Sequence, residues 1–135
     1  MVHAFDPPGV AVPFGIFSNA AWQPEGQTLH IAGQVSVDEN WNVVGKGNME
    51  IQTRKILKNI QTILQSVGGN MTDIVSVIVY VTDMTPLMDI HQVRSEFFQK
   101  PYPSSTLVEV AALVKPEYLI EISAIATIPF HRIKN

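Results

Sequence analysis

The sequence predicts an α+β protein in which six strands form a mixed sheet and two helices cover one of its faces. Three observations predict this fold. Turn formers divide residues 1–47 into short apolar pieces, apolar residues later recur in two segments at three- and four-residue steps, and residues 74–81 are almost continuously apolar and β-branched. The expected order is β-β-β-α-β-α-β-β, in which strand–helix–strand connections favour some parallel pairing.

The first strands and the first helix are expected in the N-terminal half. Pieces bounded by Pro, Gly, Asp and Asn predict strands near residues 16–21, 29–35 and 42–45, connected as hairpins. A long helix follows, because Asn48 is a suitable N-cap and Gly68 can adopt the positive φ that closes many helices. Its apolar stripe consists of Met49, Ile56, Leu57, Ile60, Ile63, Leu64 and Val67.

The second half is expected to supply three strands and a second helix. Residues 74–81 predict a strand covered on both faces, and residues 105–113 and 119–128 predict two more. Thr85 as N-cap and Pro86 at the first helical position begin the second helix. Because two helices cover only one face of such a sheet, we expect the helix-free face to be buried in a homo-oligomer.

Composition limits the classes of function. The chain has 135 residues, 46% of them hydrophobic, which predicts one domain over residues 1–135. Nine Lys and Arg against twelve Asp and Glu give a net charge of −3, which argues against a nucleic-acid partner. With no cysteine, no phosphate loop and no metal-ligand spacing, we expect no cofactor and no metal. Without a signal peptide or an apolar run of about 20 residues, we expect a cytoplasmic protein and no membrane contact.

Glu121 is the first candidate for chemistry. Strand alternation places it on one face with Ser123, as a single carboxylate in an otherwise apolar strand. Burying such a carboxylate is costly unless it is paired or protonated, a combination that suits a general acid or base. The alternative interpretation is a solvated edge position or a structural salt bridge.

Two further residues have a functional and a structural interpretation. His91 flanks the apolar face of the second helix, where a histidine can bind a ligand or form a structural hydrogen bond. Ser105 lies where a strand begins and could offer a hydroxyl to a ligand or simply start the strand. No His and acid are placed so as to make Ser105 a nucleophile.

Several segments resemble the Rid/YjgF family of reactive-intermediate (enamine/imine) deaminases. The C-terminal signature is carried by Pro103-Ser104-Ser105-Thr106-Leu107-Val108-Glu109-Val110 and Leu119-Ile120-Glu121-Ile122. The resemblance continues in Phe17–Ala20, Ile31–Gln34, Asn59–Val67, Ser76–Asp83 and Phe97-Phe98. It implies a chorismate-mutase-like α+β fold and a homotrimer with ligand pockets between subunits. It also implies hydrolysis of 2-aminoacrylate and related enamines or imines to 2-keto acids and ammonia, without a cofactor.

The resemblance also assigns positions to the site. Glu121 stands at the position of the glutamate that orients the attacking water. The other positions carry changed residues: Ser105 for the carboxylate-binding arginine, Leu107 for a frequent cysteine, Phe17 for a tyrosine, Ala32 for the serine before Gly33, and His91 for an asparagine. Losing the arginine removes a bidentate, charge-assisted contact, so we expect a more apolar pocket.

The favoured hypothesis is a divergent hydrolytic deaminase whose substrate is not 2-aminoacrylate and is aromatic or lacks the α-carboxylate. Glu121 activates water, His91 binds substrate or moves a proton, and the backbone of Ser105, Thr106 and Leu107 holds polar substrate atoms. The alternative is a non-catalytic trimer that binds a small metabolite, or another protein, in the same clefts. A ribonuclease, the label that some relatives carry, is disfavoured by the net charge of −3.

Overall fold

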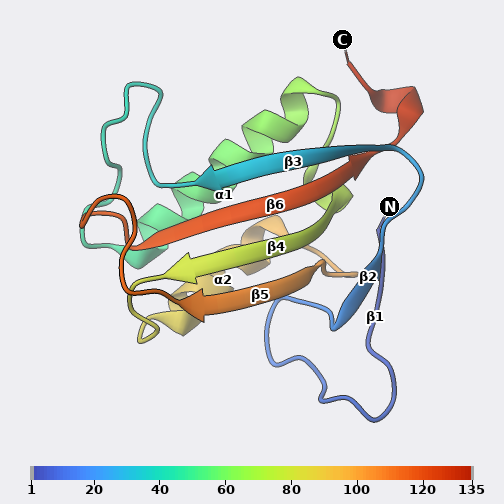
Figure 1. Cartoon of the computed structure of the whole chain (residues 1–135), viewed down its shortest axis with the longest axis horizontal. Coiled ribbons are helices and arrows are strands. Elements are labelled where there is room, and N and C mark those ends of the chain that lie inside the picture. The colour runs from blue at the N-terminus through green and yellow to red at the C-terminus, as the bar shows by residue number, and fades with distance from the viewer. Residues whose placement is uncertain (1, 135) are drawn as a thin grey trace.

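The structure, a computed structural model, describes residues 2–134, and its strands and long helices follow one another in the order β-β-β-α-β-α-β-β, although the first three strands are not all the expected ones (Figure 1). The strands and long helices are β1 (His3–Phe5), β2 (Ala20–Trp22), β3 (Gln27–Gln34), α1 (Met49–Ser66), β4 (Ile74–Val81), α2 (Leu87–Phe97), β5 (Ser104–Glu109) and β6 (Ile120–Ile128). Two short 3-10 helices, η1 (Met71–Asp73) and η2 (Phe130–Arg132), precede β4 and follow β6.

The main sheet is mixed and has four strands in the order β3-β6-β4-β5. β6 is antiparallel to both of its neighbours, whereas β4 and β5 are parallel because α2 crosses between them. Both long helices lie behind the sheet in Figure 1, on the same face. The expectation of an α+β fold with two helices on one face of a mixed sheet is confirmed.

The expected N-terminal strands are partly wrong. β1 and β2 form a separate two-stranded sheet, so the six strands do not share one sheet. Residues 42–45 form a loop whose only ladder contact in the described chain is one bridge between Val37 and Val43. Asp38 holds this loop, because its Oδ1 accepts hydrogen bonds from the backbone N–H groups of Asn40 and Asn42, both at 2.9 Å.

The remaining strands differ from expectation only in their bounds. Residues 16–21 were expected as a strand, but the observed strand begins at Ala20. The residues before Ala20 instead lie beside the start of β5, where Ser18 N–H donates to the Pro103 carbonyl at 2.9 Å. β5 ends at Glu109 rather than residue 113, because its partner β4 ends at Val81, opposite Glu109.

The helix ends follow the predicted capping for α1 but not for α2. Asn48 Oδ1 accepts from Ile51 N–H at 2.9 Å, and Gly68 has φ +87° after the last turn. α2 begins at Leu87, with Pro86 as N-cap and no side-chain cap. Thr85 is therefore not the N-cap, and its backbone N–H donates to Asp83 Oδ1 at 2.9 Å in the turn before the helix.

An ion pair between the partly exposed Arg132 and the buried Asp73 attaches the C-terminal segment to the body. Asp73, 1% exposed, accepts from Arg132 Nη1 at 3.0 Å and from Nη2 at 2.6 Å. Arg132 also donates to the Gly68 carbonyl at 3.1 Å, and Asp73 accepts from Asn70 N–H at 2.9 Å. The bidentate contact therefore joins η2 to the start of β4 and the end of α1.

Strand register separates the two faces of the main sheet. Val79 and Ile122 pair on the helix-covered face and are at most 1% exposed. The helix-free side, called the open face below, carries Tyr80 opposite Glu121, with Ile78 two residues away and 38% exposed. Burial of the open face in a homo-oligomer stays a prediction. In residues 2–134 no helix combines the length and the hydropathy that crossing a membrane requires.

Candidate functional site

A cavity of about 320 Å³ lies between β5 and α2 and is called the β5–α2 cavity. Ser105 and Leu107 face it because they pair with Val77 and Val79, whose side chains belong to the helix-covered face. The turn before α2, its first turns and the segment before β2 supply the other walls. The lining residues are Phe14, Phe17, Met84, Leu87, His91, Ser105 and Leu107. Five of the seven are apolar or aromatic, so the cavity suits an apolar ligand body.

His91 is one of two polar side chains that line this cavity. It is 8% exposed, and neither ring nitrogen has a hydrogen-bond partner among the described residues. Phe14 meets the ring edge-on at 5.8 Å between centroids, and Gly15 leaves it room, since a Cβ there would lie 2.7 Å from Cε1. Burial, and then the charge of Arg94, lower the pKa of His91 below 6.5, so the ring is neutral at pH 7. It therefore offers one unused donor and one unused acceptor.

Arg94 lies beside the cavity on the same helix and is 1% exposed. Its Nη2 donates to the Ile16 carbonyl at 2.9 Å and to Ser105 Oγ at 3.0 Å. The guanidinium carbon lies 5.9 Å from the centre of the Phe98 ring, within cation–π range. Desolvation lowers the pKa of Arg94 to about 10, so the side chain is still a cation at pH 7.

Glu121 lies on the open face, away from the β5–α2 cavity. Its register partner there is Tyr80, whereas its neighbours Ile120 and Ile122 belong to the core on the other face. The carboxyl group lies over Gly33, where a Cβ would be 2.8 Å from Glu121 Cδ. β3 is irregular between Ile31 and Gln34, around Gly33, so the bulge and the missing side chain together make room for the carboxylate.

The structure brings the predicted site residues together as two groups. Phe17, His91, Ser105 and Leu107 line the β5–α2 cavity. Glu121 and Gly33 meet on the other side of the sheet, next to the exposed Ala32. Thr106 pairs with Ile78 and is exposed on the open face. Within one chain, therefore, the sheet separates Glu121 from His91.

The most buried charge of the site, Arg94, was not among the predicted site residues. Arg94 lies three residues after His91 and four after Ile90, so the helical spacing places it on the buried side of α2. A charged residue within such an apolar repeat was the available signal. Phe14, Met84 and Leu87 were also missed as cavity walls, because they come from turns or the helix start and meet only in the folded chain.

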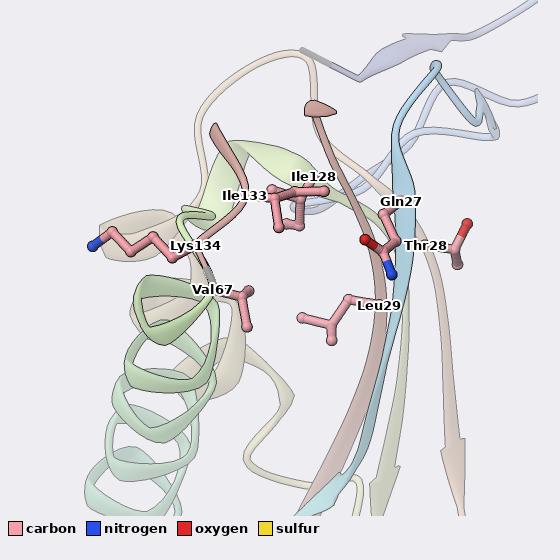
Figure 2. Close-up of a pocket in the computed structure, with 7 residues that line it drawn as sticks. All are labelled: Gln27, Thr28, Leu29, Val67, Ile128, Ile133 and Lys134. Atoms are coloured by element: carbon pink, nitrogen blue, oxygen red, sulfur yellow. The ribbon is translucent and has the colours of Figure 1, made fainter. Parts of the chain in front are cut away.

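A second cavity, of about 250 Å³, lies between the end of α1 and the edge of the sheet (Figure 2). Val67, Leu29, Ile128 and Ile133 surround it, and Lys134 extends away from it in this view. Its lining includes no histidine and no acidic residue. Among residues 2–134 no cluster of three or more His, Asp or Glu side chains could hold a metal ion. The β5–α2 cavity therefore remains the stronger candidate site.

Comparisons with known proteins agree with this architecture. Residues 10–128 match the family described as Endoribonuclease L-PSP. A RutC family protein of Pyrococcus horikoshii is 39% identical over 114 residues, covering 84% of this chain and 88% of that protein. A RutC family protein of Sulfurisphaera tokodaii is 35% identical over 115 residues, covering 85% and 90%.

Solved structures give the same assignment. The crystal structure of YyfB, a Yersinia pestis protein of unknown function in the conserved Rid family, has a TM-score of 0.86 at 33% identity and covers 94% of this chain and 98% of that one. RidA from an Antarctic Psychrobacter has a TM-score of 0.70 at 30% identity, covering 87% and 92%. The chain therefore belongs to the Endoribonuclease L-PSP family, also called Rid/YjgF, as its C-terminal motifs indicated.

Proposed function

We propose that the protein is a cofactor-independent hydrolytic deaminase that converts a reactive imine or enamine to a carbonyl compound and ammonia. The observation that carries this proposal is the distribution of polar groups over two faces of one sheet. His91 and Ser105 line the β5–α2 cavity, whereas Glu121 lies over Gly33 on the open face. Because one chain separates these groups, the proposed site combines the cavity of one copy with Glu121 of a neighbouring copy in a homo-oligomer.

Two properties of the chain support this assembly. The open face leaves Ile78 and Val108 each 38% exposed on adjacent strands, and apolar surface of this kind favours association. β5 is also an edge strand of the main sheet, bridged on its outer side only at Ser104 among the described residues. Resemblance to the Rid/YjgF family supports a trimer as the form of the homo-oligomer.

The proposed reaction is an addition followed by an elimination. Water attacks the carbon of the C=N bond while the Glu121 carboxylate accepts one of its protons, giving a carbinolamine. The imine reacts in its protonated form, so this carbinolamine is neutral. Glu121 returns the proton to the nitrogen, the C–N bond breaks as ammonia leaves, and the hydroxyl releases its proton to solvent to form the carbonyl product. His91 is neutral, so its N–H can donate to the substrate or its free nitrogen can accept a proton.

The cavity favours a substrate larger and more apolar than 2-aminoacrylate. Its volume of about 320 Å³ exceeds what a three-carbon imine fills, and Phe14, Phe17 and Leu107 line it. An imine with an aliphatic or aromatic side chain makes more contact with these walls and releases more water from them. We therefore propose a substrate with a bulky apolar body.

Imines generated in place by an amino-acid oxidase test the proposal. Alanine, leucine and phenylalanine serve as precursors, and ammonia release is followed together with semicarbazide trapping of the imine. We expect the protein to accelerate hydrolysis of the leucine and phenylalanine imines more than that of the alanine imine. Glu121→Gln should abolish the acceleration, because the amide cannot accept the proton from water.

A matched control and a refuting outcome complete this test. Glu25→Gln makes the same chemical change at an exposed position away from both groups and should leave turnover intact. Full turnover by Glu121→Gln would show that the carboxylate has no part in the reaction. No acceleration with any of the three imines would reject ordinary 2-imino acids as substrates.

A non-catalytic binding protein is the second candidate. It is favoured by one observation, that Ser105 and Phe17 line the cavity where the family resemblance places an arginine and a tyrosine. Such a protein retains a ligand through purification without converting it. Native mass spectrometry that finds a co-purified small molecule, unchanged after long incubation, would favour this function over the deaminase.

A further inference from the structure

Arg94 is a buried cation without a buried counter-ion. The salt bridges among residues 2–134 involve Arg54 and Arg132, and none involves Arg94. A buried, unpaired charge destabilises a fold, and a hydrophobic residue of similar size fills such a position at lower cost. The charge of Arg94 is therefore retained at an energetic disadvantage, which points to a role beyond packing.

The chemistry of the contact fixes the hydroxyl of Ser105. Arginine has donors only, so Ser105 Oγ must accept the bond from Arg94 Nη2 at 3.0 Å. The hydroxyl proton is then left to donate elsewhere, and Ser105 lines the β5–α2 cavity. The same Nη2 is held by the Ile16 carbonyl at 2.9 Å, which fixes the guanidinium in place. Ser105 thus becomes a donor toward the cavity, polarised by the cation behind it.

We propose that Arg94 is a positioning and specificity residue: through Ser105 it presents a hydroxyl donor to the ligand and makes the β5–α2 cavity prefer a carboxylate to a neutral group. Ser105 itself is uncharged, and the positive charge that attracts the ligand comes from Arg94 on α2, which lies behind Ser105 as seen from the cavity. The ligand class is a carboxylate with an apolar body. The proposal rests on the proposed function for the identity of the cavity as the substrate site, but its test requires no turnover.

The rest of the lining agrees with this ligand class. None of the seven residues that one chain contributes to the lining is acidic, so these walls do not repel an anion. His91 lies within the same cavity with both ring nitrogens unpartnered in the described chain, and its N–H is available to the second carboxylate oxygen. The aromatic rings of Phe14 and Phe17, 5.7 Å apart in an edge-to-face arrangement, then surround the apolar body.

Binding of 3-phenylpropanoate and its neutral analogue 3-phenylpropanamide, measured by calorimetry on the intact oligomer, tests the proposal. We expect the carboxylate to bind at least about tenfold more tightly than the amide. The reason is that the Arg94 cation, separated from the ligand by Ser105, attracts an anion in a site of low dielectric constant. Arg94→Met should reduce this ratio to about one, and Arg94→Lys should restore part of it. Ser105→Ala should weaken carboxylate binding while Arg94 stays in place.

The variants separate this role from a purely structural one. If Arg94→Met does not fold, as circular dichroism will show, Arg94→Lys and Ser105→Ala carry the test. Glu25→Gln, a change at an exposed position away from the cavity, should keep the carboxylate preference. Equal binding of the two probes, an unchanged ratio in Arg94→Met, or no carboxylate binding in the millimolar range would overturn the proposal. Absence of imine hydrolysis with the preference intact would instead reject the deaminase alone.

Discussion

Mixing two inactive variants tests whether one site needs two copies of the chain. His91→Leu removes a group of the β5–α2 cavity, and Glu121→Gln removes the carboxylate of the open face, so each homo-oligomer should be inactive. In a closed ring whose sites each take one group from each of two neighbouring copies, random equal mixing leaves both groups intact at about one site in four. Every trimer that contains both variants has one intact site of three, so co-expressed trimers freed of the inactive homotrimers should recover about a third of the wild-type rate.

The assay uses the same oxidase-generated imines, on oligomers purified through two different affinity tags so that both variants are present. Separately purified oligomers, mixed without exchange of subunits, provide the control and should stay inactive. If His91 and Glu121 of the same copy served one site, no mixture would recover activity, since every chain carries one defect. Failure of the mixed oligomer to regain turnover would therefore refute the two-copy site.

Three further predictions concern single residues. Gly33→Ala should lower turnover by about a hundredfold with little change in stability, because the new Cβ displaces the Glu121 carboxylate; kinetics beside a thermal melt will show it. Burial lowers the pKa of His91, so as pH falls the unfolded chain takes up the imidazole proton before the folded chain does. The free energy of unfolding should therefore fall as pH drops through about 6.5. In urea titrations at several pH values, the His91→Leu variant should lose that part of the pH dependence. Asn48→Ala should destabilise the protein by about 1 kcal/mol in the same titrations, because Ile51 N–H loses its cap.

Local signals made most of the fold predictable. The Asn48 cap, the apolar stripe and Gly68 together defined α1, and each of these features acts over a few neighbouring residues. The loop at residues 42–45 was mistaken for a strand because its apolar residues resemble one, whereas Asp38 commits the backbone to a turn. β1 was missed because a three-residue strand has too few residues for an alternating pattern.

The candidate site was predictable only in part. Alternation along β6 correctly gave Glu121 a face different from the core, while position on the second helix and at a strand start, together with the family resemblance, singled out His91 and Ser105. Neither approach indicated that Arg94 reaches Ser105, because that contact depends on how α2 packs against β5. The helical spacing from Ile90 indicates the buried side of α2 for Arg94, but a charged residue on an amphipathic helix ordinarily lies in solvent, and the packed structure shows that this one is buried.

The attachment of η2 to the body has a practical consequence for anyone who shortens the chain or adds to it. Removing residues 130–134 would take away Arg132 and leave the Asp73 carboxylate buried without its cation. The same cut would open the cavity shown in Figure 2, where Ile133 forms one wall beside the end of α1. A trimmed protein is therefore expected to aggregate or lose solubility well before its enzymology can be studied, and affinity tags are better placed before β1 than directly after η2.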